Sequence, residues 1–478
     1  MTPKLAHQPV SDCCPPLEPK RPVVPSALAA FSLILLASSV ARAEKPQKLT
    51  LKHAVALALQ KNPSVHAAQD YAQAVRRTIA MAQAGRYPKL DFSEGFTRGN
   101  NPVYVFGSLL TQRQFTARNF ALGFLNVPPP LDNFKTEFTG AVPLSDAGET
   151  GRQIRNARLA AAAADQGAQR TRQQVIFAVI QAFFDELLAR ANVRVAEAAV
   201  AMTRADLARA KARERQGLTV PSDVLSAQVQ LAVAMEGLIR ARNGQAIAQA
   251  ALNVAIGLPE SAPTEAEGKF SLAKFATGTL AEQQQYALEH RPDYREAAIG
   301  QARAANGVSM ARRRFLPTVG LFGSWEEDNQ TFATRGGNNW VAGAALTFNI
   351  FNGGADRARL QETQARESQA QALKQQMAAQ VRFEVEEAYL DMTAARQRVV
   401  VSRTSAAEAE ESLQILRNRY ATGLATMTDL LRAENAETTA RRDHLNAIYD
   451  YWLAAASLEL ATGRLAPRSK VVAQQTIP

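Results

Sequence analysis

The sequence predicts a mixed α and β fold in which long helices continue into a sheet of membrane-spanning strands, and three observations lead to this prediction. The two halves of the 478-residue chain repeat one another. Each half contains two segments in which apolar and polar residues alternate, as they do in strands with one apolar face. Each half also contains a very long alanine-rich stretch typical of helix. A chain of this length holds either several domains or one repetitive architecture.

The composition restricts the class of protein further. The chain is 46% hydrophobic and 21% charged, with a formal net charge of +11. These values exclude a polytopic helical membrane protein and argue against general disorder. The two cysteines, Cys13 and Cys14, are adjacent, so no disulfide framework is expected.

Residues 1–43 have the pattern of a cleaved signal peptide. Lys20 and Arg21 precede the apolar stretch Ser26–Val40, and the small-x-small sequence Ala41-Arg42-Ala43 follows it. The stretch is short for a membrane anchor, which needs about 20 residues. We therefore expect export and cleavage before Glu44. Beyond residue 43 no uncharged apolar run reaches 18 residues, which leaves an exported soluble protein or an outer-membrane β-barrel.

The internal repeat defines the expected domains. Asn62-Pro63 matches Arg291-Pro292 at an offset of 229, whereas Gly217-Leu218 matches Gly423-Leu424 at an offset of 206. The difference of 23 residues indicates an insertion in the stretch 100–133, which we expect outside the rim of a barrel. The predicted segments are a first repeat at 44–258, a linker at 259–278, a second repeat at 279–465 and a C-terminal tail at 466–478.

Each repeat is predicted to contain a helix, two strands and a long helical hairpin. In the last strand, for example, apolar residues alternate from Trp340 to Ile350. The predicted strands are 88–99 and 134–146 in the first repeat and 317–328 and 338–351 in the second, and the hairpins are 150–256 and 354–462. Long helices laced with charges suggest coiled-coil-like packing.

The hairpins are predicted to reverse at two glycines. Gly217 and Gly423 can adopt the left-handed conformation that ends a helix, with Leu218 and Leu424 as the hydrophobic residues that follow. These exposed turns are either simple helix reversals or docking sites for an adaptor protein. Arg213, Arg417 and Arg419 flank them and fit either a solvated helix face or a role at the tip.

Four strands per chain require an assembly. An open sheet has two unpaired edges, which hydrocarbon cannot satisfy, and membrane barrels need about eight strands at least. Three copies would supply twelve strands and place the long helices in a ring, so that a hollow conduit forms.

The order and doubling of these elements resemble the outer-membrane efflux proteins of TolC type. The motifs that carry the resemblance are Asn62-Pro63, Ile350–Gly354, Arg419-Tyr420-x-x-Gly423, and the closing Gly257-Leu258 and Gly463-x-Leu465. The resemblance implies a homotrimer with a twelve-stranded barrel in the outer membrane and a helical barrel in the periplasm. It also implies a periplasmic adaptor and an inner-membrane pump as partners, and export of drugs, toxic ions or polypeptides.

The resemblance also marks a candidate pore constriction at Asp429 and Arg432. In the family, acidic residues near the tips of the inner helices narrow the pore. Asp429 occupies such a place, but Arg432 stands where a second acid would fit. Asp429 also fits a capping box with Thr426, which is the alternative interpretation.

Four aromatic residues, Phe96, Phe134, Trp325 and Trp340, are candidates for an aromatic girdle at the lipid interface. We expect no enzyme, no cofactor and no metal site, because the histidines are scattered and no phosphate-binding loop is present. The sequence has no basic patch to which a nucleic acid could bind. The alternative to a channel is an exported structural or adaptor protein built on a helical-hairpin coiled coil.

Overall fold

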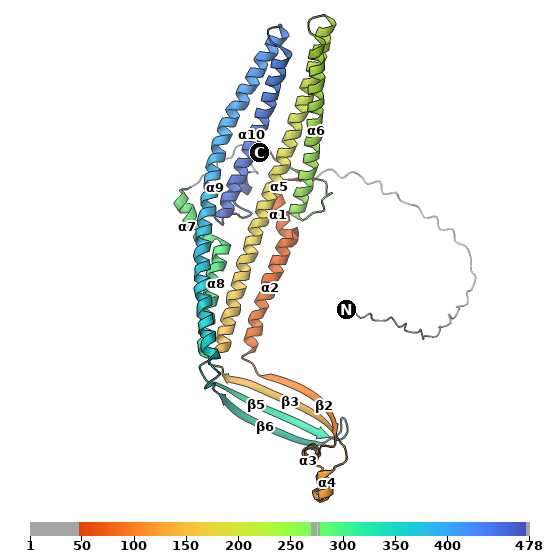
Figure 1. The fold of residues 1–478 in the computed structure, drawn as a ribbon, viewed down its shortest axis with the longest axis vertical. Helices are drawn as coiled ribbons and strands as arrows, with labels where there is room; N and C mark the ends of the chain where they lie inside the picture. The colour runs from red at the N-terminus through yellow and green to blue at the C-terminus, as the bar shows by residue number, and fades with distance from the viewer. Residues whose placement is uncertain (1–46, 269–274, 276–277, 475–478) are drawn as a thin grey trace, which may run out of the picture. The chain divides into compact units, whose positions relative to one another are not determined.

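The computed structural model describes residues 47–268, 275 and 278–474, all within one compact unit. The predicted signal peptide, residues 1–43, lies outside the described residues. Two long helical hairpins dominate the described part (Figure 1). They comprise α5 (Glu149–Arg215) with α6 (Pro221–Ile256), and α9 (Ala355–Ala421) with α10 (Met427–Ala461).

The helices α5 and α9 each have 67 residues and therefore extend for roughly 100 Å. Shorter helices continue the bundle toward the sheet: α2 packs on α5, α8 packs on both α5 and α9, and α10 packs on α5, which joins the two hairpins. The order of long helices and strands along the chain confirms the predicted mixed α and β class. The shorter helices are α1 (Leu51–Lys61), α2 (Pro63–Ala84), α7 (Leu280–His290) and α8 (Pro292–Arg313).

The breaks between the paired short helices differ between the two halves. In the first half, the side chain of Asn62 caps α2 by accepting a hydrogen bond from the Ser64 amide at 2.9 Å. In the second half, Arg291 makes no side-chain cap. Its guanidinium instead forms ion pairs with Asp293 and Glu384, each at 2.6 Å.

The four long strands form one antiparallel sheet in the order β2-β3-β5-β6 (Figure 1). The sheet therefore leaves β2 and β6 as its two edges. The strands β2 and β5 lead away from the helices and β3 and β6 return to them. Their bounds are β2 (Lys89–Gly99), β3 (Leu131–Ser145), β5 (Thr318–Asn329) and β6 (Gly337–Thr347).

Strand β6 is shorter than its alternating sequence pattern, which continues to Ile350, so the predicted end at residue 351 is wrong. The strand ends at Thr347, which pairs with Thr318, the first residue of β5, and the residues that follow contact the start of α9. The side chains of Asn349 and Asn352 both donate to the carboxylate of Asp356, at 3.4 and 2.7 Å.

Three short elements outside the insertion were not predicted. The strand β1 (Gln47–Leu49) pairs in parallel with β4 (Thr264–Ala266), which lies in the segment expected to be a linker. The helix α11 (Lys470–Gln474) lies in the expected C-terminal tail, and its Val471 and Val472 are fully buried. Elements of three to five residues are too short to show a hydrophobic period.

The insertion between β2 and β3 is folded. It contains α3 (Pro102–Thr111), the 3₁₀ turn η1 (Ala117–Phe120) and α4 (Leu122–Asn126). Asn101 caps α3 by accepting hydrogen bonds from the amides of Val103 and Tyr104, at 3.0 and 3.2 Å. The end of α3 lies against the ends of β3, β5 and β6.

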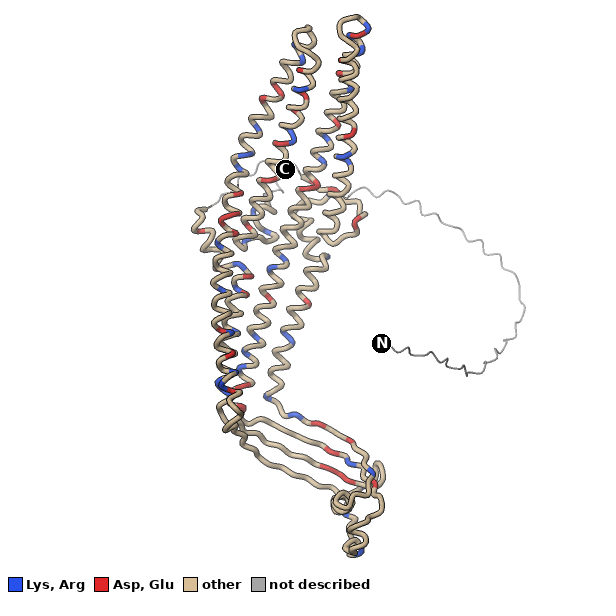
Figure 2. Tube along the Cα trace, viewed as in Figure 1, with Lys and Arg blue, Asp and Glu red and all other residues tan. Residues whose placement is uncertain are grey.

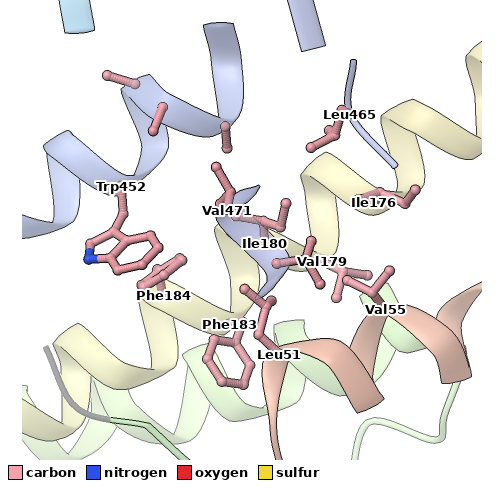
Figure 3. Close-up of a cluster of buried hydrophobic side chains, with 14 of the residues drawn as sticks. Leu51, Val55, Ile176, Val179, Ile180, Phe183, Phe184, Trp452, Leu465 and Val471 are labelled. Carbon is pink, nitrogen blue, oxygen red and sulfur yellow. The ribbon is translucent and has the colours of Figure 1, made fainter. Parts of the chain in front are cut away.

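The main hydrophobic core lies where α1, α5, α9, α10 and α11 meet, and Figure 3 shows part of it. Phe184 stacks on Trp452 with ring centroids 4.9 Å apart, and both side chains are almost completely buried. Burying several large side chains in one layer fixes how the two halves join. None of the described helices has an apolar stretch long enough to cross a membrane.

Candidate functional site

The register of the sheet places all four candidate interface aromatics on one face. Phe92, Phe138, Trp325 and Trp340 are direct cross-strand neighbours and form a row across the four strands. Phe96 and Phe134 are also cross-strand neighbours, four residues further along the strands and away from the helices, with ring centroids 4.7 Å apart. Because side chains alternate between faces, Phe96, Phe134, Trp325 and Trp340 share this aromatic face. Trp340 is 78% exposed in the single chain.

The opposite, polar face carries charged and amide side chains. Ser93, Glu137, Glu326 and Asn339 form one row across the four strands. Lys135 lies beside this row and forms ion pairs with Glu137 at 3.2 Å and with Glu326 at 2.8 Å. A sheet with one aromatic face and one polar face is suited to separate lipid from water.

The helix tips reverse at the two predicted glycines. Gly217 has φ = 68° and Gly423 has φ = 83°, both in the left-handed region. The amides of the next residues close the turns: Leu218 donates to the Arg213 carbonyl at 2.9 Å and Leu424 to the Arg419 carbonyl at 2.8 Å. The side chains of Leu218 and Leu424 are 61% and 70% exposed. The two tips therefore present leucine side chains to solvent.

Asp429 forms a reciprocal cap at the start of α10. Its carboxylate accepts hydrogen bonds from the Thr426 hydroxyl at 2.6 Å and the Thr426 amide at 3.1 Å, while its own amide donates to the Thr426 hydroxyl. These bonds lower the pKa of Asp429, and the positive charges of Arg432 and Arg419 lower it further. Asp429 is therefore ionised at neutral pH. Arg432 lies on the following turn with its side chain exposed.

A contact between the two hairpin tips was missed by sequence reasoning. The guanidinium of Arg213, on α5, donates to the carbonyls of Tyr420 and Ala421 at the end of α9, at 3.0 and 3.3 Å. It also lies 5.0 Å from the centre of the Tyr420 ring. An arginine next to a turn glycine appears in the sequence as a solvated charge, and only the placement of α9 beside α5 reveals its acceptors.

Buried carboxylates behind the tips were also missed. Asp206 and Glu434 are each only 1% exposed, and Asp206 forms an ion pair with Arg209. Glu434 lies 3.8 Å from the guanidinium of Arg417. Burial raises the pKa of Glu434, and the nearby arginine charges offset this only in part. On a helix rich in glutamate, these acids are indistinguishable by sequence from solvated ones.

The remaining charges are dispersed. Lysine, arginine, aspartate and glutamate alternate along the helices rather than collecting in one patch (Figure 2). Within the described residues, no three His, Cys, Asp or Glu side chains are placed to hold a metal ion.

Known proteins are similar to this chain in sequence and in fold. The profile of the outer membrane efflux protein family matches residues 54–258 and 284–464. Protein CyaE of Bordetella pertussis is 26% identical, covering 88% of this chain and 86% of that protein. The alkaline protease secretion protein AprF of Pseudomonas aeruginosa is 24% identical, covering 86% and 83%. The Campylobacter jejuni CmeC outer membrane channel has a similar structure, with a TM-score of 0.75 at 17% identity over 94% of this chain and 96% of that chain.

The fold and the two-faced sheet thus define a protein of the TolC-like channel class. The family profile matches most of the chain, and the chain belongs to the outer membrane efflux protein family. It is an outer membrane transport protein, and members of this family are channels rather than enzymes. The family membership favours the channel over the alternative of an exported adaptor protein.

Proposed function

We propose that the protein is a homotrimeric channel-tunnel, a passive exit duct for substrates in efflux or secretion. The observation that carries this proposal is the pair of open sheet edges. The edge strands β2 and β6 both have 11 residues and run in opposite directions. The β2 strand of one copy can therefore pair antiparallel with β6 of the next. This head-to-tail contact repeats around a closed ring, and three copies give a barrel of twelve strands.

The two faces of the sheet support the orientation of this barrel. The aromatic face would contact lipid and the polar face would line the pore. The strands have 11 to 15 residues, enough for tilted membrane strands, which need about 9 to 11. Glu94 and Glu327 lie on the aromatic face between the tryptophan row and the pair Phe96 and Phe134. In this orientation they would lie among the polar head groups, with the two phenylalanines in the same interfacial layer.

The helices would then form a periplasmic tube with its tips toward the inner membrane. Exposed Leu218 and Leu424 at the turns of Gly217 and Gly423 offer apolar contacts for a periplasmic adaptor. Asp429 and Arg432 would lie at the narrow end of the tube, where one ionised acid per copy favours cations. The inner-membrane pump would select the cargo and this chain would carry it. The relative AprF, named for secretion of a protease, supports a polypeptide as one class of cargo.

The proposal is tested by electrophoresis of outer membranes in mild detergent. A trimer closed by strand pairing should migrate as one large species when unheated and as a single chain after boiling. A chain that migrates as a monomer before heating, and is released from membranes by salt, would refute the proposal.

A further inference from the structure

The insertion between β2 and β3 lies at the outer end of the sheet, where the end of α3 turns onto the polar face and α4 extends beyond the strands (Figure 1). The side chain of Asn339 donates to the Thr111 carbonyl at the end of α3, at 3.3 Å. The next residue, Gln112, donates through its side chain to the side chain of Asn133 at 2.8 Å. Asn133 and Asn339 both belong to the polar face. Gly337, also on this face, leaves room for α3, because a Cβ there would collide with the Thr111 carbonyl.

This attachment is fixed by buried polar bonds. Gln112 is 3% exposed, and Asn133, which accepts its hydrogen bond, itself donates to the carboxylate of buried Asp328 at 2.6 Å. Arg113 adds a second attachment at the strand end, since its guanidinium donates to the backbone carbonyl of Asn338 at 2.6 Å and to the side-chain oxygen of the same residue at 2.8 Å. Breaking such a buried network leaves polar groups without partners, which is costly.

The insertion also buries apolar side chains. Val105 and Leu109 of α3 are 1% and 7% exposed. The ring of Phe115 contacts Phe106 and Phe120 edge to face, with centroids 4.9 and 5.2 Å apart. The segment is therefore a folded unit that holds its shape on the sheet.

We propose that residues 101–130 form a cap that folds inward and narrows the outer mouth of the channel. The inference rests on the proposed trimeric barrel, in which the polar face lines the pore. Twelve strands about 4.8 Å apart and tilted by about 40° enclose a barrel roughly 24 Å across. A helix with its side chains is about 10 Å across, so three caps attached to the inner wall occupy most of the opening. The cap thus limits the size of what passes the outer mouth.

A unique thiol behind the cap tests this arrangement. The two native cysteines lie in the predicted signal peptide, so Ser324→Cys introduces a single reactive site on the polar face, closer to the helices than the cap. Intact cells carrying the full-length protein are treated with a small membrane-impermeant maleimide or with a bulky polyethylene-glycol maleimide. The labelling rates are compared with those in a variant whose residues 101–130 are replaced by a short glycine-rich turn. Leu321→Cys, on the aromatic face, is the matched control and should resist both reagents.

Because the deletion could prevent folding, the double variant Gln112→Ala, Arg113→Ala releases the cap at full chain length. We expect the bulky reagent to label Ser324→Cys at least about tenfold faster without the cap, with an intermediate rate in the double variant. Equal rates in all three backgrounds, with rapid labelling by the small reagent, would overturn the cap and leave the channel intact. Failure of the small reagent to label even the variant without the cap would instead refute a pore-facing polar face, and with it the proposed function.

Discussion

Replacing Arg213 by alanine should loosen the contact between the two hairpin tips. The side chain supplies two charge-assisted hydrogen bonds to the carbonyls of Tyr420 and Ala421, and it lies over the Tyr420 ring. Two partly exposed bonds and one cation–π contact amount to about 2–3 kcal/mol. A loss of this size shifts the balance between joined and separated tips by roughly 30- to 150-fold. If the tips form the narrow end of the tube, their separation widens it.

The assay is single-channel conductance of the purified protein in planar bilayers. Arg213→Ala should raise the mean conductance or the fraction of time spent in a high-conducting state. Arg213→Lys should have a smaller effect, because lysine keeps the positive charge and can still donate to one carbonyl. Arg215→Ala removes the same charge from an exposed position two residues away and is the matched control. Unchanged conductance in a folded, assembled Arg213→Ala protein would show that the contact does not hold the tips together.

Three further predictions concern buried or capping charges. Arg291→Ala removes the 2.6 Å partner of buried Asp293, which then has only Arg170 at 3.8 Å, and should lower the free energy of unfolding by about 3 kcal/mol. Adding Asp293→Asn should recover part of that loss in thermal melts. Burial raises the pKa of Glu434, so the folded state binds its proton more tightly than the unfolded chain, and stability falls as pH rises through this pKa. Glu434→Gln should therefore melt above the wild type at pH 8, with the difference shrinking toward pH 5; no dependence on pH would contradict this. If the carboxylate faces the pore, Asp429→Ala should raise conductance and weaken block by divalent cations. Asp223 occupies the equivalent place in the first repeat, so Asp223→Ala is the comparison. Equal conductance and equal block in the two variants would show that both acids only cap helices.

Much of the fold could be predicted because long periodic patterns leave few alternatives. Apolar and polar residues alternate along the strand that contains Trp340, so one face of that strand must be apolar. Gly217 and Gly423 interrupt helices that otherwise continue for dozens of residues. The end of β6 could not be predicted from alternation, since the apolar pattern continues through Phe348 and Ile350. The strand ends where its neighbour β5 begins at Thr318, and this register depends on three-dimensional placement.

The candidate site could be predicted only where local geometry suffices. The cap made by Thr426 and Asp429 depends on residues three apart and follows from sequence. The bond from Arg213 to Tyr420 joins residues 207 positions apart, and no local pattern reports it. The same holds for Gln112, which lies in a segment that sequence alone indicated to be a loop and whose partner belongs to β3.

The most direct measurement for the central claim is the number of chains in the particle extracted from outer membranes. Native mass spectrometry of the mature protein in detergent should give three copies, since only neighbours can pair the exposed edges of β2 and β6. A single chain that stays folded in detergent-free water would contradict the account, because its open sheet would then need neither a neighbour nor a membrane.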